Sequence, residues 1–361
     1  MKFGSKIKGV LCGFLSLTLV SVAVVCVYFR LGDFNITGDD AVLMAAALTM
    51  SKGSYFTATE PEDNNKATEN KKETVPVETA PKTEKIKFSS DYYNTYGKHK
   101  NQKKYPVYTK HISNGGTKYQ NFYVKNSTPY NLNIGETLKK NLGFKLENNN
   151  DVQVLIYHTH TSESYLDCDA GYYYSDYYPR TSDKRYNVTR VGEAIAQQLE
   201  NAGIGVVHDT TIHDYTYSGS YARSRSTVEK YLEKYPKIKV TLDIHRDSIG
   251  DTNYKVKPTF TYKGKKGAQI MIMSGYNTYD YYNFPNWNYN LRFALKLQQT
   301  CETKYQGITR PLNFGNFAYN MNINTGSLLI EIGTDSNTLE EAVYSGNLLG
   351  EALAEVLQKN S

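Results

Sequence analysis

The chain has few cysteines, and none stands in a metal-binding pattern. Four occur in 361 residues, and two of them, Cys12 and Cys26, lie in an apolar N-terminal segment. The remaining pair, Cys168 and Cys301, is too few for a disulfide framework in so long a chain. No CxxC pair is present, which excludes a cysteine-rich zinc site.

Several other motifs are missing. No GxSxG motif is present, which argues against a serine hydrolase. No glycine-rich loop follows the strand predicted at Val152–Tyr157, which argues against a phosphate site. The net charge is +6 without a clustered basic stripe. This charge indicates mild affinity for an anionic surface, and we find no nucleic-acid motif.

A long apolar run lies near the N-terminus. Gly9–Phe29 is 21 residues without a charge and follows three lysines in residues 1–8. At about 1.5 Å per residue it can cross a bilayer core of about 30 Å, and the lysines place residues 1–8 in the cytoplasm. We prefer an uncleaved transmembrane anchor over a cleaved signal peptide, whose apolar region is usually about 7–15 residues. The sequence thus predicts a single-pass protein of the cell membrane with an extracytoplasmic C-terminal domain.

The composition changes twice after the anchor. Residues 51–87 are rich in Glu, Lys, Thr, Asn and Pro, a composition that buries too little apolar surface to offset its ordering entropy. We therefore expect residues 30–104 to form an extracytoplasmic, largely disordered tether. A folded domain is expected from 105 to 361.

Strands and helices alternate within this domain. This order is typical of an α/β fold with a mostly parallel sheet and helices on both faces. Asn187 and Gly203 are expected to cap one helix, and Thr338 with Glu341 forms a capping box for the last one. Strands are predicted at 121–125, 152–157, 204–207, 238–244, 259–262, 269–273 and 328–332, and helices at 134–141, 188–202, 221–235, 287–305 and from 339 onward.

Tyrosine is abundant, with 33 residues. Many occur in stretches without periodicity, such as Leu166–Arg185, which we expect to be a long functional or disordered loop. We interpret the tyrosines as amphipathic filler of a loop-rich surface rather than as a groove that contacts sugar or peptide.

Titratable side chains follow the predicted strands where these end. The first strand is followed by His158 and His160, the second by His208, and the third by His245, Arg246 and Asp247, while Glu331 lies at the end of the last. Parallel strands have their carboxyl ends at one edge of a sheet, where ligands bind. Catalytic zinc takes about three ligands from His and Glu or Asp. The pattern therefore favours a zinc site at this edge.

Four segments together resemble the stage II sporulation protein P family. They are VLIYHTHTSESY, YNVTRVGEAIAQQLENAGIGVVHD, TLDIHRDS and LLIEIGTDSNTLEEA, in this order from 154 to 342. The family consists of membrane-anchored peptidoglycan hydrolases of endospore-forming bacteria, within the wider zinc-dependent N-acetylmuramoyl-L-alanine amidases. The resemblance implies an amidase-like fold and cleavage of the amide between N-acetylmuramic acid and L-alanine of the stem peptide during engulfment. It also implies an endopeptidase activity on peptide cross-links, and stage II sporulation proteins D and M as partners.

The resemblance also implies roles for individual residues. His160 and His245 match two zinc ligands of the wider amidases, and Glu331 matches their general base. Their third ligand is a Glu at the start of the first crossover helix, whereas this sequence has Arg185, Tyr186 and Asn187 there. Either of two residues can supply the third ligand: Glu163, which we prefer, or His208. His158, His208, Arg246 and Asp247 are expected to line the site.

The missing helix-start Glu leaves a second function open. A non-catalytic wall-binding or scaffold protein with a degenerate amidase fold would have lost the metal. The presence of His160, His245 and Glu331 favours the enzyme.

Overall fold

The computed structural model describes residues 101–149 and 151–359. The predicted cytoplasmic tail, the anchor at 9–29 and nearly all of the predicted tether lie outside these residues. None of the helices in the described part of the chain is both long and apolar enough to cross a membrane.

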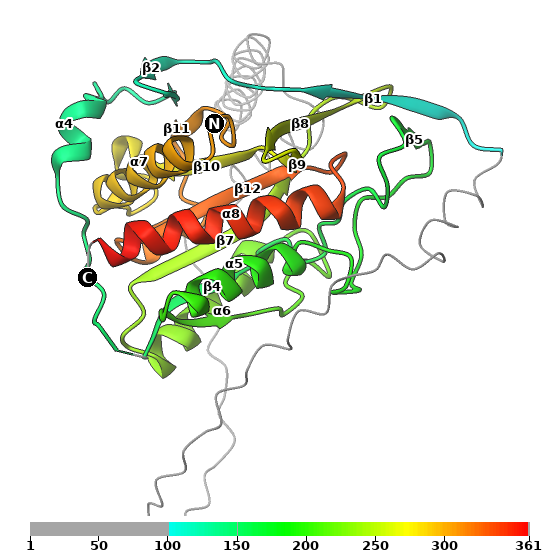
Figure 1. The fold of residues 1–361 in the computed structure, drawn as a ribbon. Coiled ribbons are helices and arrows are strands. Elements are labelled where there is room, and N and C mark those ends of the chain that lie inside the picture. The colour runs from blue at the N-terminus through cyan, green and yellow to red at the C-terminus, as the bar shows by residue number, and fades with distance from the viewer. Residues whose placement is uncertain (1–100, 150, 360–361) are drawn as a thin grey trace, which may run out of the picture. The chain divides into compact units, whose positions relative to one another are not determined.

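The main sheet has eight strands and is mixed (Figure 1). Five of its strand pairs are parallel, while β10 runs antiparallel to β12 and β2 antiparallel to β3. The α/β class is therefore confirmed, but the sheet reverses direction once near its middle. The strand order is β2 (Thr117–Tyr119), β3 (Phe122–Asn126), β11 (Leu312–Gly315), β10 (Ile270–Gly275), β12 (Ser327–Thr334), β7 (Val240–Asp247), β4 (Val152–Tyr157) and β6 (Gly205–His208).

A second sheet has the order β5 (Tyr172–Tyr174), β1 (Lys104–Lys110), β8 (Lys255–Tyr262) and β9 (Lys265–Ala268). Strands β8 and β9 form a hairpin whose turn residues, Lys263 and Gly264, both have positive φ. The strand predicted at 269–273 is confirmed as β10, which belongs to the main sheet. The stretch 166–185, which showed no periodicity, contributes β5 to this second sheet.

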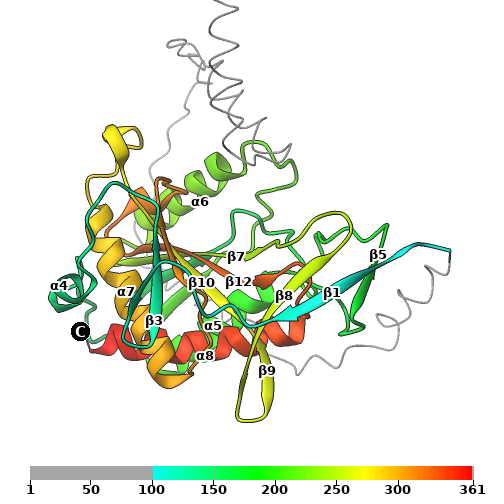
Figure 2. The same ribbon diagram turned by 90° about the horizontal axis from the view of Figure 1, so that it is seen from above.

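Helices cover both faces of the main sheet, as predicted. The helices α5 (Thr189–Asn201), α7 (Trp287–Lys304) and α8 (Leu339–Gln358) lie on one face, and α6 (Ser220–Lys234) lies on the other (Figure 2). The Thr338–Glu341 capping box at the start of α8 is confirmed. In α5 the N-cap is Val188 rather than Asn187, although the Asn187 side chain accepts from the backbone N–H of Thr189 at 3.1 Å. Gly203, with a φ of 75°, follows the C-cap residue Ala202. The shorter helical segments are α4 (Ile134–Lys139), η1 (Thr278–Asp280) and η2 (Met321–Ile323).

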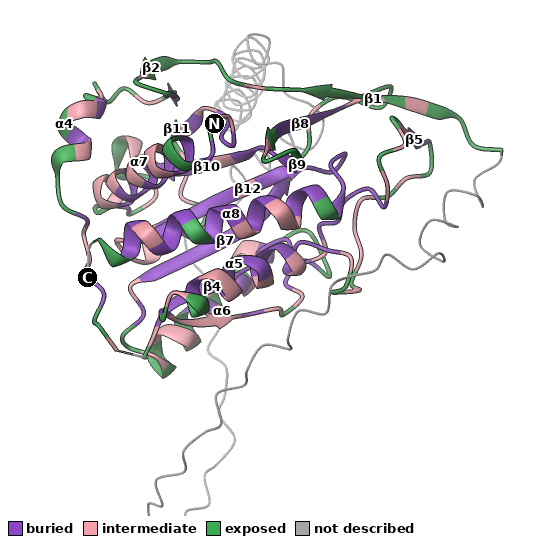
Figure 3. Ribbon diagram, viewed as in Figure 1, coloured by how far each residue is buried: buried purple, intermediate pink, exposed green. Residues whose placement is uncertain are grey.

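The central strands of the main sheet are largely buried (Figure 3), and successive side chains of a strand point to opposite faces. In β4, Val154 and Ile156 pack with the α5, α7 and α8 side of the core, while Leu155 and Tyr157 pack with Val228 of α6. Alternation assigns Ile244 of β7 to the first side and its neighbours Asp243 and His245 to the α6 side. Glu331 pairs in register with His245, so both side chains lie on the α6 side of the sheet.

Candidate metal centre

Three predicted site residues come together beside the end of β4. His160 Nδ1 lies 3.3 Å from Glu163 Oε1, and His245 Nδ1 lies 3.4 Å from Glu163 Oε2. One ligand atom from each of the three lies within 4.8 Å of the others, and all three residues are buried. The tight turn after β4, in which Glu163 N donates to His160 O at 3.0 Å, brings the first two together. Strand β7 supplies the third.

Neighbouring cations hold Glu163 ionised. The backbone N–H of Arg246 donates to Glu163 Oε2 at 3.1 Å, and Arg180 Nη2 lies 3.7 Å from Oε1. Burial alone would raise the pKa of Glu163, but Arg246 and the two histidines hold it well below its ordinary value. An ionised carboxylate between two imidazoles is a suitable ligand for a divalent cation.

Asp243, which we did not predict from the sequence, contacts His245 from the side opposite Glu163. Its Oδ1 lies 2.8 Å from His245 Nε2, and it accepts from the backbone N–H and the hydroxyl of Thr159 at 2.8 and 2.6 Å. Burial lowers the pKa of His245, but Asp243 and Glu163 together raise it well above its ordinary value. The available signal was the spacing in TLDIHRDS, since residues two apart on a strand share a face.

Glu331 lies beside His245 on the neighbouring strand. Its Oε2 atom is buried and accepts no hydrogen bond from the described residues. Burial, then repulsion from Asp247, raises the pKa of Glu331 to about 8, although His245 opposes the shift. A carboxyl group with a pKa near neutrality can both accept and return a proton.

His158 and His208 contact each other rather than the cluster. Their Nε2 atoms lie 2.8 Å apart, and His158 Nδ1 lies 2.8 Å from Ile244 O. Both rings lie against Gly192 of α5. Burial lowers the pKa of His158 to about 4 and that of His208 well below its ordinary value. The structure thus places Glu163, and not His208, beside His160 and His245.

Arg246 and Asp247 have separate contacts. The Arg246 side chain donates to Ser164 O at 3.2 Å and to Pro179 O at 2.8 Å, so it fastens two loop segments around Glu163. Asp247 forms an ion pair of 2.7 Å with Arg310 Nη1. Both residues lie next to the cluster, on opposite faces of β7.

The donor set fits a catalytic zinc ion. Two imidazoles and one carboxylate form a common three-ligand set for such zinc, and a fourth position is left for water. Asp243 completes the arrangement, because histidine ligands of metals usually donate their other ring N–H to a carboxylate or carbonyl.

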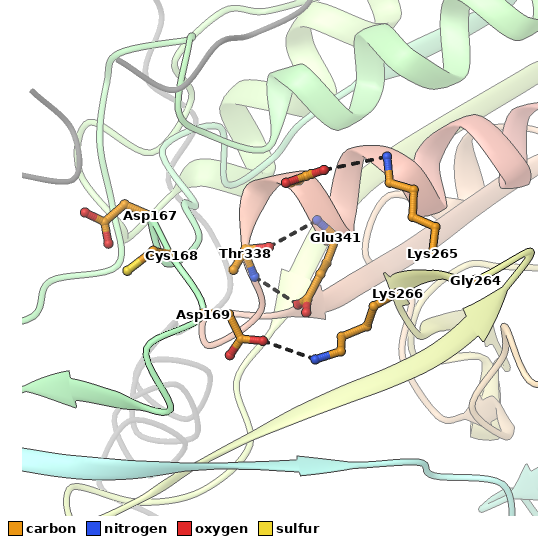
Figure 4. Close-up of a pocket in the computed structure, with 9 residues that line it drawn as sticks. Asp167, Cys168, Asp169, Gly264, Lys265, Lys266, Thr338 and Glu341 are labelled. Carbon is orange, nitrogen blue, oxygen red and sulfur yellow. Dashed lines mark hydrogen bonds and ion pairs between the residues drawn. The ribbon is translucent and has the colours of Figure 1, made fainter. Parts of the chain in front are cut away.

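A separate pocket lies at the N-terminus of α8 (Figure 4). Two pairs of its charged groups form ion pairs: Lys266 with Asp169 at 3.2 Å and Lys265 with Glu340 at 3.7 Å. No residue that we predicted for the site from the sequence lines this pocket.

Comparisons with known proteins agree with the resemblance found in the sequence. The model of the family described as Stage II sporulation protein P (SpoIIP) matches residues 42–354. A curated Stage II sporulation protein P from Bacillus subtilis (strain 168) is 33% identical over 215 residues, which are 56% of this chain and 50% of that protein. The chain thus spans about half the length of this relative.

Solved structures with a related arrangement are more distant in sequence. The N-acetylmuramoyl-L-alanine amidase AmiC2 of Nostoc punctiforme is 15% identical with a TM-score of 0.35, covering 58% of this chain and 97% of that one. The CwlD amidase from Clostridioides difficile, solved with the GerS lipoprotein, is 11% identical with a TM-score of 0.34, covering 58% and 98%.

Proposed function

Because the chain belongs to the stage II sporulation protein P family, we propose that it is a zinc-dependent peptidoglycan hydrolase of endospore formation. It cleaves the amide between N-acetylmuramic acid and L-alanine of the stem peptide. The observation that carries the proposal is the buried cluster of His160, Glu163 and His245, with ligand atoms within 4.8 Å of one another.

The position of Glu163 explains how the site can form without a glutamate at the start of the first crossover helix. Its backbone oxygen accepts from Val188 N at 2.8 Å, and Ser164 forms a bridge with Asn187. Glu163 therefore lies against the residues that precede α5, where the wider amidases carry their third ligand. A carboxylate from the turn after β4 replaces the one from the helix, which favours the enzyme over a wall-binding protein without metal.

Zinc held by His160, Glu163 and His245 would supply Lewis-acid chemistry at the scissile carbonyl and lower the pKa of water. Glu331, in register beside His245, accepts the proton that the attacking water loses. It then returns that proton to the nitrogen leaving the lactyl–alanine amide, which is a poor leaving group as an anion. The products are a free lactyl carboxylate and the amine of the stem peptide. Asp243 holds His245 in place during both steps.

The wider setting of the reaction is also part of the proposal. The apolar run at 9–29 anchors the chain in the cell membrane, and the tether extends the domain toward the wall outside the cytoplasm. Stage II sporulation proteins D and M are the expected partners, and peptide cross-links a second class of substrate. These statements rest on the sequence and on the family.

The test is His245→Ala, with His111→Ala as a matched control because His111 is exposed and outside the cluster. We expect His245→Ala to lose zinc and the release of stem peptides from peptidoglycan, and the control to keep both. Metal content by atomic emission and peptide release by chromatography measure these results. Full zinc occupancy in His245→Ala would refute the metal assignment. Release without zinc would refute the zinc mechanism.

A further inference from the structure

A row of aromatic rings begins at His160. Tyr217 stacks on the His160 ring at 4.8 Å between centroids, and Tyr221 of α6 meets that ring edge-on at 5.6 Å. Tyr319 stacks on Tyr221 at 5.2 Å, and Phe317 stacks on Tyr319 at 5.1 Å. The row therefore extends the candidate metal centre along the α6 side of the sheet.

The row is open to solvent at two places. Tyr217 is 55% exposed and Tyr319 is 41% exposed, while Tyr221, which contacts both His160 and Tyr319, is only partly exposed. Every large hydrophobic side chain that is exposed in the described part of the chain is a tyrosine. A surface that inserts into lipid typically carries Trp, Phe or Leu, whereas tyrosine combines an apolar ring face with a polar rim. The row thus suits a ligand that is itself amphipathic.

The backbone holds Tyr319 in a costly conformation. Tyr319 and Asn320 have φ of 43° and 59°, values that are unfavourable for residues with a Cβ and cluster at functional sites. Asn320 Nδ2 donates to Tyr221 O at 2.9 Å and to Ser224 Oγ at 3.1 Å. These bonds fix the loop that carries Tyr319 against the first turns of α6.

The same contacts continue to the metal cluster. Ser224 Oγ lies 2.7 Å from Thr159 Oγ1, which donates to Asp243 Oδ2 at 2.6 Å. Asp243 in turn contacts His245. Tyr319 is therefore placed relative to the candidate metal centre by its neighbour Asn320, by hydrogen bonds from Asn320 to Asp243, and by the contact of Asp243 with His245.

The opposite end of the site is charged. One face of β7 carries Asp243, His245 and Asp247 in succession. The aromatic row is connected to Asp243 through Ser224 and Thr159. At the other end Arg310 forms an ion pair with Asp247, and its Nε and Nη2 atoms are buried without an acceptor among the described residues. The site thus has an aromatic end and a charged end on either side of His245.

In contrast to our interpretation of the tyrosines from the sequence as surface filler, we propose that Tyr217, Tyr221 and Tyr319 form a subsite for a pyranose ring of the glycan strand. The inference rests on the proposed function, in which the scissile bond joins a sugar to a charged peptide. A pyranose has an apolar C–H face and a hydroxyl rim, which match the ring face and the phenol groups of tyrosine. The peptide then extends toward Asp247 and Arg310.

The test measures binding without turnover, in protein that also carries Glu331→Gln. The probes are glycan strands freed of stem peptides, and the free stem peptide. We expect Tyr319→Ala to weaken glycan binding about tenfold, to leave peptide binding and zinc content unchanged, and to be rescued by Tyr319→Phe. The matched control is Tyr254→Ala, which removes a tyrosine that is 38% exposed and outside the row.

Tyr217→Ala provides a second variant whose backbone is not strained, in case Tyr319→Ala folds poorly. Parental glycan affinity in both alanine variants would overturn the subsite, as would an equal loss in Tyr254→Ala. Failure of the proposed function has a different signature: the chain with Glu331 intact would release no stem peptide, while Tyr319→Ala would still lose glycan binding.

Discussion

His245 Nε2 lies 2.8 Å from Asp243 Oδ1, while its Nδ1 faces Glu163 Oε2 at 3.4 Å. The two nitrogens of one ring therefore have different neighbours. A metal bound at Nδ1 would leave the remaining ring proton on Nε2, where it faces the Asp243 carboxylate. Asp243 would thus favour the tautomer that the proposed zinc site requires.

The first prediction concerns Asp243. Asp243→Asn keeps the size of the side chain but removes the charge that stabilises the Nε2 proton of His245. We expect zinc affinity to fall about 10- to 100-fold, the usual effect of losing such a partner. Competition with a chromogenic chelator measures the affinity. Asp151→Asn, in an exposed ion pair with Lys237, is the control. Equal affinity in the two variants would contradict the role of Asp243.

The second prediction concerns Glu331. Glu331→Gln preserves shape and removes the proton acceptor beside His245. We expect the variant to bind zinc and wall fragments normally and to lose at least about a hundredfold in turnover, the low end for a general acid–base. Steady-state release of stem peptides measures this loss. Near-normal turnover would refute the role of Glu331 as the general base. Loss of zinc would show that Glu331 is a metal ligand instead.

The third prediction concerns Gly192 of α5. A Cβ there would lie 2.6 Å from His208 Nε2 and 2.7 Å from His158 Nε2. Although alanine is the better helix former, we expect Gly192→Ala to destabilise the domain by about 1–3 kcal/mol, as overpacking does. Urea unfolding measures the change. Glu200→Ala, at an exposed position of the same helix, should stay within about 0.5 kcal/mol. Unchanged stability in Gly192→Ala would mean that the histidine pair can move away.

The fourth prediction concerns pH. Burial, then His158 and Lys184, holds the pKa of His208 well below its ordinary value, so the unfolded chain binds this proton more readily than the folded one. The stability that neutral His208 contributes is therefore complete above about pH 6.5 and is lost as the pH falls below it, by up to about 1.4 kcal/mol per pH unit.

His208→Gln should reduce this dependence. In chelator-treated protein, we expect the fall in free energy of unfolding between pH 7 and pH 5 to be about 1–2 kcal/mol smaller in the variant. Metal-binding residues are the same in both proteins, so their titration cancels in the comparison. An identical fall would show that His208 is not neutral in the folded state.

Local sequence patterns predicted most of the helices and strands. The apolar run at Val152–Tyr157 and the Thr338–Glu341 box depend on neighbours in the chain, and both occur as expected. Asn187 lies one residue before the N-cap of α5. The reversal between β10 and β12 was not predicted, because an antiparallel pair is fixed by contacts between segments more than fifty residues apart. The strand β5 was missed for the same reason, since its one partner strand among the described residues is β1.

In the site, too, features set by local sequence were predicted, and features set by contacts between distant segments were not. Histidines at strand ends were visible in the sequence, and His160 and His245 do lie together. The face of the sheet to which a histidine at a strand end points depends on the pleat of that strand. The contact between His158 and His208 could therefore not be predicted from their places in the sequence. Asp243 was overlooked because a buried aspartate has no pattern of its own until its partner His245 is known. The metal-binding roles of these residues stay predictions.

The attachment of β1 also determines how the domain responds to a pull on the chain before residue 101. The first half of β1 pairs with β5 and the second half with β8. A load on that end therefore opens the β1–β5 pairs first and leaves the main sheet untouched. Arg180, in the same excursion as β5, lies 3.7 Å from Glu163 and is held independently by an ion pair of 2.7 Å with Asp214. The second sheet would therefore yield to a pull before the main sheet and the candidate metal centre.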